Sequence, residues 1–147
     1  MEAEIQKIDR KNTICILSSF IFVINIIIAY YYKYYIYGSL FVALVISSIL
    51  FHSNPQKIYT NILDKIVILA IFMYGGYIFV TKQTKNKTNN IQIQIAIILS
   101  FLTTIYLYYY GYLYNKYCYD NNIQIANIYH SLLHIIGSIG HILIIIM

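Results

Sequence analysis

Residues 123–147 read IQIANIYHSLLHIIGSIGHILIIIM, and this stretch decides the fold class. It contains no Lys, Arg, Asp or Glu, and it is longer than the roughly 20 apolar residues that a helix needs to cross a bilayer. The whole chain has the same character, with 60% hydrophobic and 10% charged residues among 147. Soluble domains average about 45–50% apolar and 25% charged residues. The composition therefore excludes an ordinary water-soluble domain and predicts an integral membrane protein.

Four further apolar runs precede this stretch, at residues 13–30, 34–52, 62–80 and 91–110. They are separated by Lys33, by the sequence Ser53-Asn54-Pro55 and by the polar stretch TKQTKNKTNN at residues 81–90. Pro55 is the only proline and a natural helix stop. We therefore expect an all-α, multi-pass transmembrane helix bundle with about five spans. Residues 13–147 would form one domain behind a polar segment at residues 1–12.

The charged and aromatic residues fit the same interpretation. Ten Lys and Arg stand against five Asp and Glu, but these cations lie mainly between the apolar runs, where they orient helices, so we expect no nucleic-acid partner. The 18 tyrosines cluster mainly at span ends, around Lys33 and at residues 106–119. Such amphipathic rings favour the headgroup level of a membrane. We therefore interpret the tyrosines as interfacial belts.

Ionisable residues inside or against the spans are the informative exceptions, because each is costly there and is a functional-site hypothesis by default. They are His52, Asp64, His130, His134 and His141. His130 and His134 are four residues apart, so a helix would present both on one face, at the spacing that offers two imidazoles to one metal ion. Ser48 and His52 have the same spacing in the second span.

With five spans, the end of the second, the start of the third and the start of the fifth lie at the same membrane face. His52, Asp64 and the pair His130 and His134 would therefore meet in one leaflet. Three neutral imidazoles with an open fourth position are a common catalytic zinc arrangement. Asp64 would balance part of the charge of the metal ion and accept a proton from the attacking water. Ser48 would donate a hydrogen bond to that water or to a developing oxyanion.

Each of these residues also has an ordinary structural interpretation. A single histidine near a helix end is commonly an interfacial residue, and the helix dipole favours an aspartate in the first turn of a helix. His141 shares the face of His134 but lies about 10 Å deeper at 1.5 Å per residue, too far to be a ligand. We expect Asn25 to bond between helices, and we expect Gly75-Gly76 to mark a kink or a close contact.

The order Ser48-Ile-Leu-Phe-His52, Leu63-Asp64 and His130-Ser-Leu-Leu-His134 resembles the signature of one membrane superfamily. That superfamily joins alkaline ceramidases, progestin and adipoQ receptors, hemolysin III-like proteins and post-GPI-attachment lipid hydrolases. The resemblance implies that His52, His130 and His134 bind a catalytic zinc ion, that Asp64 activates water and that Ser48 supports them. Members usually have seven spans, so this chain would be a shortened member.

The leading hypothesis is an integral membrane zinc hydrolase that cleaves an amide or ester bond of a membrane lipid, ceramide-like by resemblance. One alternative is a non-catalytic protein in which the same metal ion staples the second and fifth spans together. Another is an ion or metal conduit that uses the histidines as a relay. An open metal position facing a cavity favours the hydrolase, a filled site favours the staple, and polar groups traced through both leaflets favour the conduit.

Overall fold

The computed structural model describes residues 13–85 and 90–147. They contain five helical segments that are long and apolar enough to cross a membrane. These segments are Thr13–Tyr31, Tyr35–Ser53, Ile58–Thr84, Ile91–Tyr119 and Ile123–Ile146. Among the described residues there is no β-strand, which confirms the predicted all-α bundle with five spans. The polar segment at residues 1–12 lies outside the described part of the chain.

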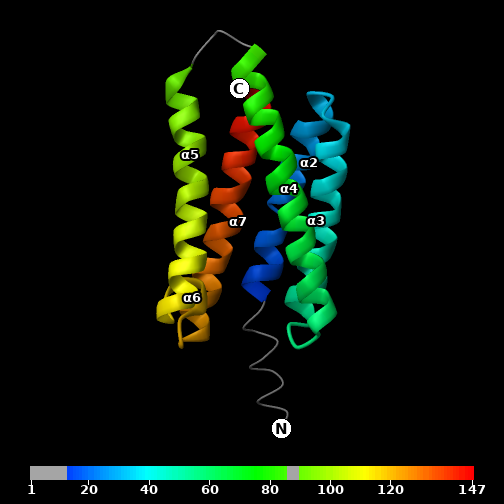
Figure 1. Cartoon of the computed structure of the whole chain (residues 1–147). Coiled ribbons are helices and arrows are strands. Elements are labelled where there is room, and N and C mark those ends of the chain that lie inside the picture. Colours follow the sequence, from blue (N-terminus) through cyan, green and yellow to red (C-terminus); the bar gives the residue numbers. More distant parts are fainter. Residues whose placement is uncertain (1–12, 86–89) are drawn as a thin grey trace.

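Helix α2 (Phe22–Tyr31) forms the upper part of the first span, above a helical stretch at residues 13–19. Helices α3 (Tyr35–Ser53) and α4 (Ile58–Lys85) follow. The fourth span begins as α5 (Ile91–Ile105), passes through a π-helical turn at Tyr106–Tyr110 and continues into α6 (Gly111–Tyr114). A 3₁₀ turn at Tyr117–Tyr119 leads to α7 (Ile123–Ile146). Figure 1 shows the helices running along one common axis, with the C-terminus at the upper end.

Helix α7 is the central helix of the bundle, because it packs against α2, α4 and α5. Helices α2 and α3 pack together, as do α3 and α4. An apolar core lies between them, with Tyr37, Phe41, Ile71 and Ile144 among its fully buried side chains, and buried polar residues accompany it. Many other large apolar side chains are exposed, as expected of a surface that faces lipid.

Helix α4 is longer than the apolar run predicted, beginning at Ile58 instead of residue 62. Its start is held by Thr60, whose hydroxyl donates to the carbonyls of Asn54 (3.2 Å) and Lys57 (2.8 Å). The first turn contains polar residues, so the apolar run alone did not indicate where the helix begins. Asp64 consequently lies in the second helical turn. The preference of the helix dipole for an aspartate in the first turn therefore does not explain its position.

The first span is interrupted at Phe20 and Ile21. Their amides bond to carbonyls three residues earlier, those of Leu17 and Ser18, instead of four. Just before the interruption, the Ser18 and Ser19 hydroxyls both donate to the Cys15 carbonyl, at 3.0 and 2.8 Å. Serine hydroxyls bonded back to the preceding turn bend helices. The paired serines therefore account for the change in helical geometry at this point.

Two polar or small residues make the close helix contacts that the sequence predicts. The Asn25 amide donates to the Ser138 carbonyl (3.0 Å) and accepts a hydrogen bond from its hydroxyl, which fastens α2 to α7. Gly75 is a close contact within the continuous helix α4. A Cβ on Gly75 would lie 2.5 Å from the Tyr37 hydroxyl. Gly76 has open space at the same position.

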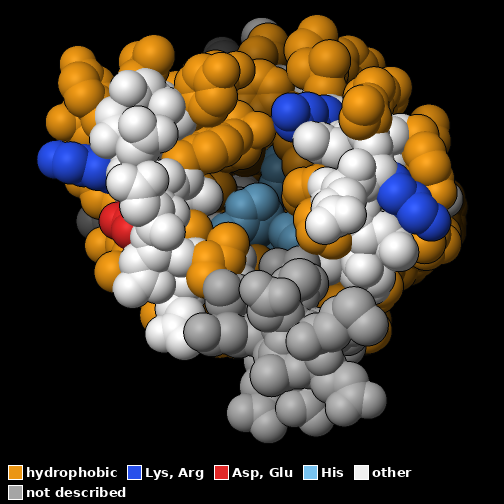
Figure 2. Space-filling view, turned by 90° about the horizontal axis from the view of Figure 1, so that it is seen from below, with side chains coloured by type: hydrophobic (Ala, Val, Ile, Leu, Met, Phe, Trp, Pro, Cys, Tyr) orange, Lys and Arg blue, Asp and Glu red, His pale blue; other side chains and the backbone are white. Residues whose placement is uncertain are grey.

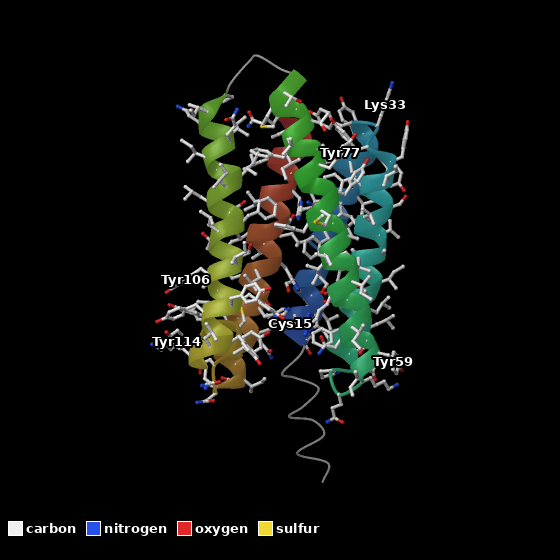
Figure 3. The ribbon with its side chains drawn as sticks, viewed as in Figure 1. Cys15, Lys33, Tyr59, Tyr77, Tyr106 and Tyr114 are labelled. Atoms are coloured by element: carbon white, nitrogen blue, oxygen red, sulfur yellow. The ribbon has the colours of Figure 1, made fainter. Side chains whose placement is uncertain are left out.

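Both ends of the bundle carry side chains suited to a membrane interface. Figure 3 shows Tyr59, Tyr106 and Tyr114 at the lower end and Lys33 at the upper end. At the upper end the Lys82 ammonium donates to the carbonyls of Ile144 (3.0 Å) and Ile145 (2.6 Å). This cation satisfies carbonyls that the last turn of α7 leaves unpaired.

Candidate metal centre

Three imidazoles from two helices meet in the lower half of the bundle. The ring centres of His52 and His130 are 4.8 Å apart, those of His130 and His134 are 5.0 Å apart, and those of His52 and His134 are 5.5 Å apart. One ring nitrogen from each residue lies within 4.8 Å of the other two. The structure thus brings together the three predicted ligands, and this His52/His130/His134 cluster could hold a metal ion.

The helix directions explain why these rings converge. Helix α3 runs down the bundle and carries His52 in its last turn, whereas α7 runs upward with His130 and His134 on consecutive turns. Because Cα–Cβ bonds tilt toward the start of a helix, His52 leans up into the bundle and His134 leans down. Within the described residues, α3 and α7 are not a closely packed pair. The imidazoles therefore bridge the space between them.

The chemistry of the cluster fits a metal ion. His52 and His134 are buried and His130 is half-buried. The Nε2 atom of His52 is buried and has no hydrogen-bond partner in the described part of the chain. An unpaired buried polar atom costs about 1–3 kcal/mol, and a bound cation would remove that cost. Imidazole nitrogens suit zinc and other transition metals.

His134 has a polar partner on the first span. The Ser18 hydroxyl lies 2.7 Å from Nδ1 of His134. From the same span, the ring of Phe22 packs against the imidazole with ring centres 5.5 Å apart. The ring of His134 thus contacts one residue on each side of the helix interruption. Nothing in the sequence pattern singled out Ser18, since two adjacent serines in an apolar run carry no periodic signal.

Asp64 and Ser48 are both buried, and each is hydrogen-bonded to a serine. The Ser47 hydroxyl donates to Oδ1 of Asp64 at 2.8 Å, joining α3 to α4. The Ser48 hydroxyl lies 2.8 Å from that of Ser19. Ser47 and Ser19 are functional candidates that the sequence reading did not identify. Adjacency to the predicted Ser48 was the available signal for Ser47, whereas Ser19 had no such neighbour among the predicted residues.

The cluster lies open to one face of the molecule. Figure 2 looks at the lower end and shows histidine side chains on the floor of a hollow with apolar side chains along part of its rim. A ligand approaching from that end could reach the imidazoles. Among the described His, Cys, Asp and Glu residues, the cluster contains no fourth metal-ligating side chain. Three protein ligands and an approach from outside are the features of an open site.

His141 is separate from the cluster, as its depth on α7 predicts. Its Nδ1 atom is hydrogen-bonded to the Tyr37 hydroxyl, and its ring lies against Phe41 and Phe101 with ring centres 5.5 and 5.0 Å away. It is buried in the apolar core, two helical turns above His134. This histidine is satisfied by a protein partner.

Comparison of the chain with protein-family models, with curated proteins and with solved structures finds no significant match.

Proposed function

We propose that this protein is an integral membrane zinc hydrolase that cleaves an amide or ester bond of a membrane lipid. The observation that carries the proposal is the His52/His130/His134 cluster, with ligand nitrogens within 4.8 Å of one another at the floor of a hollow. Structural zinc sites use four protein ligands, whereas catalytic sites use three and keep one position open. The resemblance of the Ser48 to His134 motif order to lipid amidases and esterases supports the choice of bond.

We assign each residue of the site a role in this reaction. His52, His130 and His134 would hold zinc through neutral ring nitrogens. When bound, zinc supplies an electrophile for the lipid carbonyl and lowers the pKa of water to about 7. Asp64 would take the proton of the attacking water. The 2.8 Å hydrogen bond from Ser47 to Oδ1 fixes the orientation of that carboxylate and leaves Oδ2 to accept the proton.

A lipid substrate suits the surroundings of the cluster. Exposed apolar side chains cover the spans, so a molecule with long acyl chains reaches the protein from within the bilayer without crossing water. The apolar side chains on the rim of the hollow would contact such chains, while the three imidazoles and Asp64 would supply the polar groups at the bond to be cleaved. An amide such as that of ceramide is the first substrate to test, because the resemblance suggests it.

Lipid turnover by purified variants tests this proposal. Zinc-loaded protein incubated with an extract of membrane lipids should release fatty acid, measured by mass spectrometry. Asp64→Asn should keep its zinc and lose at least 100-fold in rate, because general base catalysis contributes about 10²–10⁴-fold. His52→Ala should lose the activity together with metal affinity, and Tyr109→Phe, whose ring is exposed, should match the wild type. Unchanged turnover by Asp64→Asn would remove that residue from its role.

A second candidate is a proton or metal-ion conduit, and it is favoured by buried polar contacts that continue above the cluster. Asn25 bonds Ser138, Tyr37 bonds His141, and Lys82 bonds the end of α7 near the upper face. Flux of protons or zinc into vesicles containing the protein would support this alternative. Zinc-dependent stability without turnover or flux would instead support a structural metal that staples α3 to α7.

A further inference from the structure

We propose that Ser18 is a positioning residue of the metal centre: by occupying Nδ1 of His134, it selects Nε2 as the atom that binds the metal. The inference rests on the metal site proposed above and extends that site to the first span, which supplies none of the three ligands. Ligating histidines generally have the second ring nitrogen bonded to a neighbouring acceptor, which fixes the tautomer and the ring orientation. In this chain the available partner is a serine hydroxyl.

The positions of the protons follow from the distances. A neutral imidazole that binds a metal through Nε2 carries its proton on Nδ1. That nitrogen lies 2.7 Å from the Ser18 hydroxyl oxygen, which would accept the proton's hydrogen bond. The hydroxyl's own proton is directed to the Cys15 carbonyl 3.0 Å away. Because a carbonyl can only accept, the chain of hydrogen bonds from His134 through Ser18 to Cys15 has a single direction.

The interruption of the first span explains how one short side chain can reach both partners. The Ser18 and Ser19 hydroxyls bond the same Cys15 carbonyl, and the turn that follows is tightened at Phe20 and Ile21. From this turn, Ser18 contacts His134 on α7, while Ser19 contacts Ser48 on α3. The two adjacent serines therefore connect the first span to both helices that carry the metal ligands.

Zinc affinity, measured in detergent by competition with a chromophoric chelator, tests the inference. Ser18→Ala should weaken zinc binding by about 10–100-fold, the usual effect of removing a partner of a ligating histidine. Ser39→Ala is the matched control, because Ser39 is exposed and bonds only the Tyr30 hydroxyl in the described structure; it should leave the affinity unchanged.

A second pair of variants isolates the hydroxyl from the shape of the side chain. Ser18→Thr keeps the hydroxyl and should retain zinc affinity near that of the wild type. Ser18→Val introduces a side chain of nearly the same shape as threonine but without the hydroxyl. It should show the same loss of zinc affinity as Ser18→Ala. The absorption spectrum of bound Co²⁺ should change with Val and Ala but not with Thr, because it reports the arrangement of the ligands around the metal.

The outcomes separate this inference from the proposed function. If the wild-type protein binds zinc and all Ser18 variants bind it equally, the metal site stands and the role of Ser18 is wrong. If Thr and Val lose affinity alike, the residue matters for packing only and the inference is overturned. If the folded wild-type protein binds neither zinc nor Co²⁺, the metal site itself is wrong.

Discussion

At the scale of the residue, the buried histidines His52 and His141 differ in their hydrogen bonding. His52 has a buried ring nitrogen without a partner in the described structure, whereas Nδ1 of His141 is bonded to the Tyr37 hydroxyl. Burying a polar atom costs free energy unless a partner compensates it. The first histidine therefore has a buried nitrogen that a cation can satisfy, whereas Nδ1 of the second already has a protein partner.

Replacing Tyr37 tests this division of roles. Tyr37→Phe removes the hydroxyl that bonds His141 and should lower the free energy of unfolding by about 1–3 kcal/mol, because a buried nitrogen loses its partner. Zinc affinity should stay at the wild-type value, since His141 lies outside the His52/His130/His134 cluster. Thermal unfolding and zinc titration of the same samples provide the two measurements.

His141→Leu on the Tyr37→Phe background is the control for that prediction. The double variant removes both partners of the hydrogen bond, so it should recover part of the lost stability. A loss of zinc binding in Tyr37→Phe would contradict the account, because it would place His141 in the metal site.

At the scale of the element, contacts between helices depend on single positions. Gly75 faces the Tyr37 hydroxyl across the boundary between α3 and α4, and Gly76 faces open space. The two glycines are adjacent and equally helical. They differ only in what surrounds them, which makes them a matched pair.

Gly75→Ala should destabilise the bundle by about 1–3 kcal/mol, because an added methyl group at a filled site forces its neighbours to move. Gly76→Ala should be neutral or stabilising by up to about 1 kcal/mol, because alanine is the better helix former and its methyl group meets no atom. Thermal unfolding of the two purified variants checks this. Equal destabilisation by both would show that the α3–α4 contact does not depend on Gly75.

The elements were predictable from the sequence to different degrees. The apolar runs indicated all five spans, and Pro55 indicated the end of α3, because burial in lipid requires a long run that is visible in one dimension. The predicted start of α4 was wrong, because Thr60 and Asn61 are polar residues inside the helix. The interruption of the first span was missed, since it depends on hydrogen bonds from Ser18 and Ser19 to Cys15.

Some features of the candidate site could likewise be predicted from the sequence, and others could not. The His52/His130/His134 cluster could be inferred because five crossings return the relevant helix ends to one face. The partners of Asp64 and Ser48 could not, since choosing Ser47 and Ser19 requires the rotation of each helix about its axis. Helix rotation is set by packing against neighbours, which a single sequence does not reveal.

At the scale of the whole molecule, the arrangement of helices creates the site. Helix α7 packs against α2, α4 and α5, while α3 packs against α2 and α4. The space between α3 and α7 is bridged by imidazoles and is open at the lower face in Figure 2. The helix arrangement thus places the candidate metal centre at a hollow in the lower face, where the proposed reaction would take place.

The central claim is that three imidazoles from α3 and α7 bind one metal ion. The most direct test is the zinc content of purified, zinc-loaded and desalted protein, measured by mass spectrometry. We predict about one zinc per chain for the wild type and for Tyr109→Phe. His130→Ala and His134→Ala should retain none. Well-folded wild-type protein without bound zinc, or histidine variants that retain as much zinc as the wild type, would contradict the account.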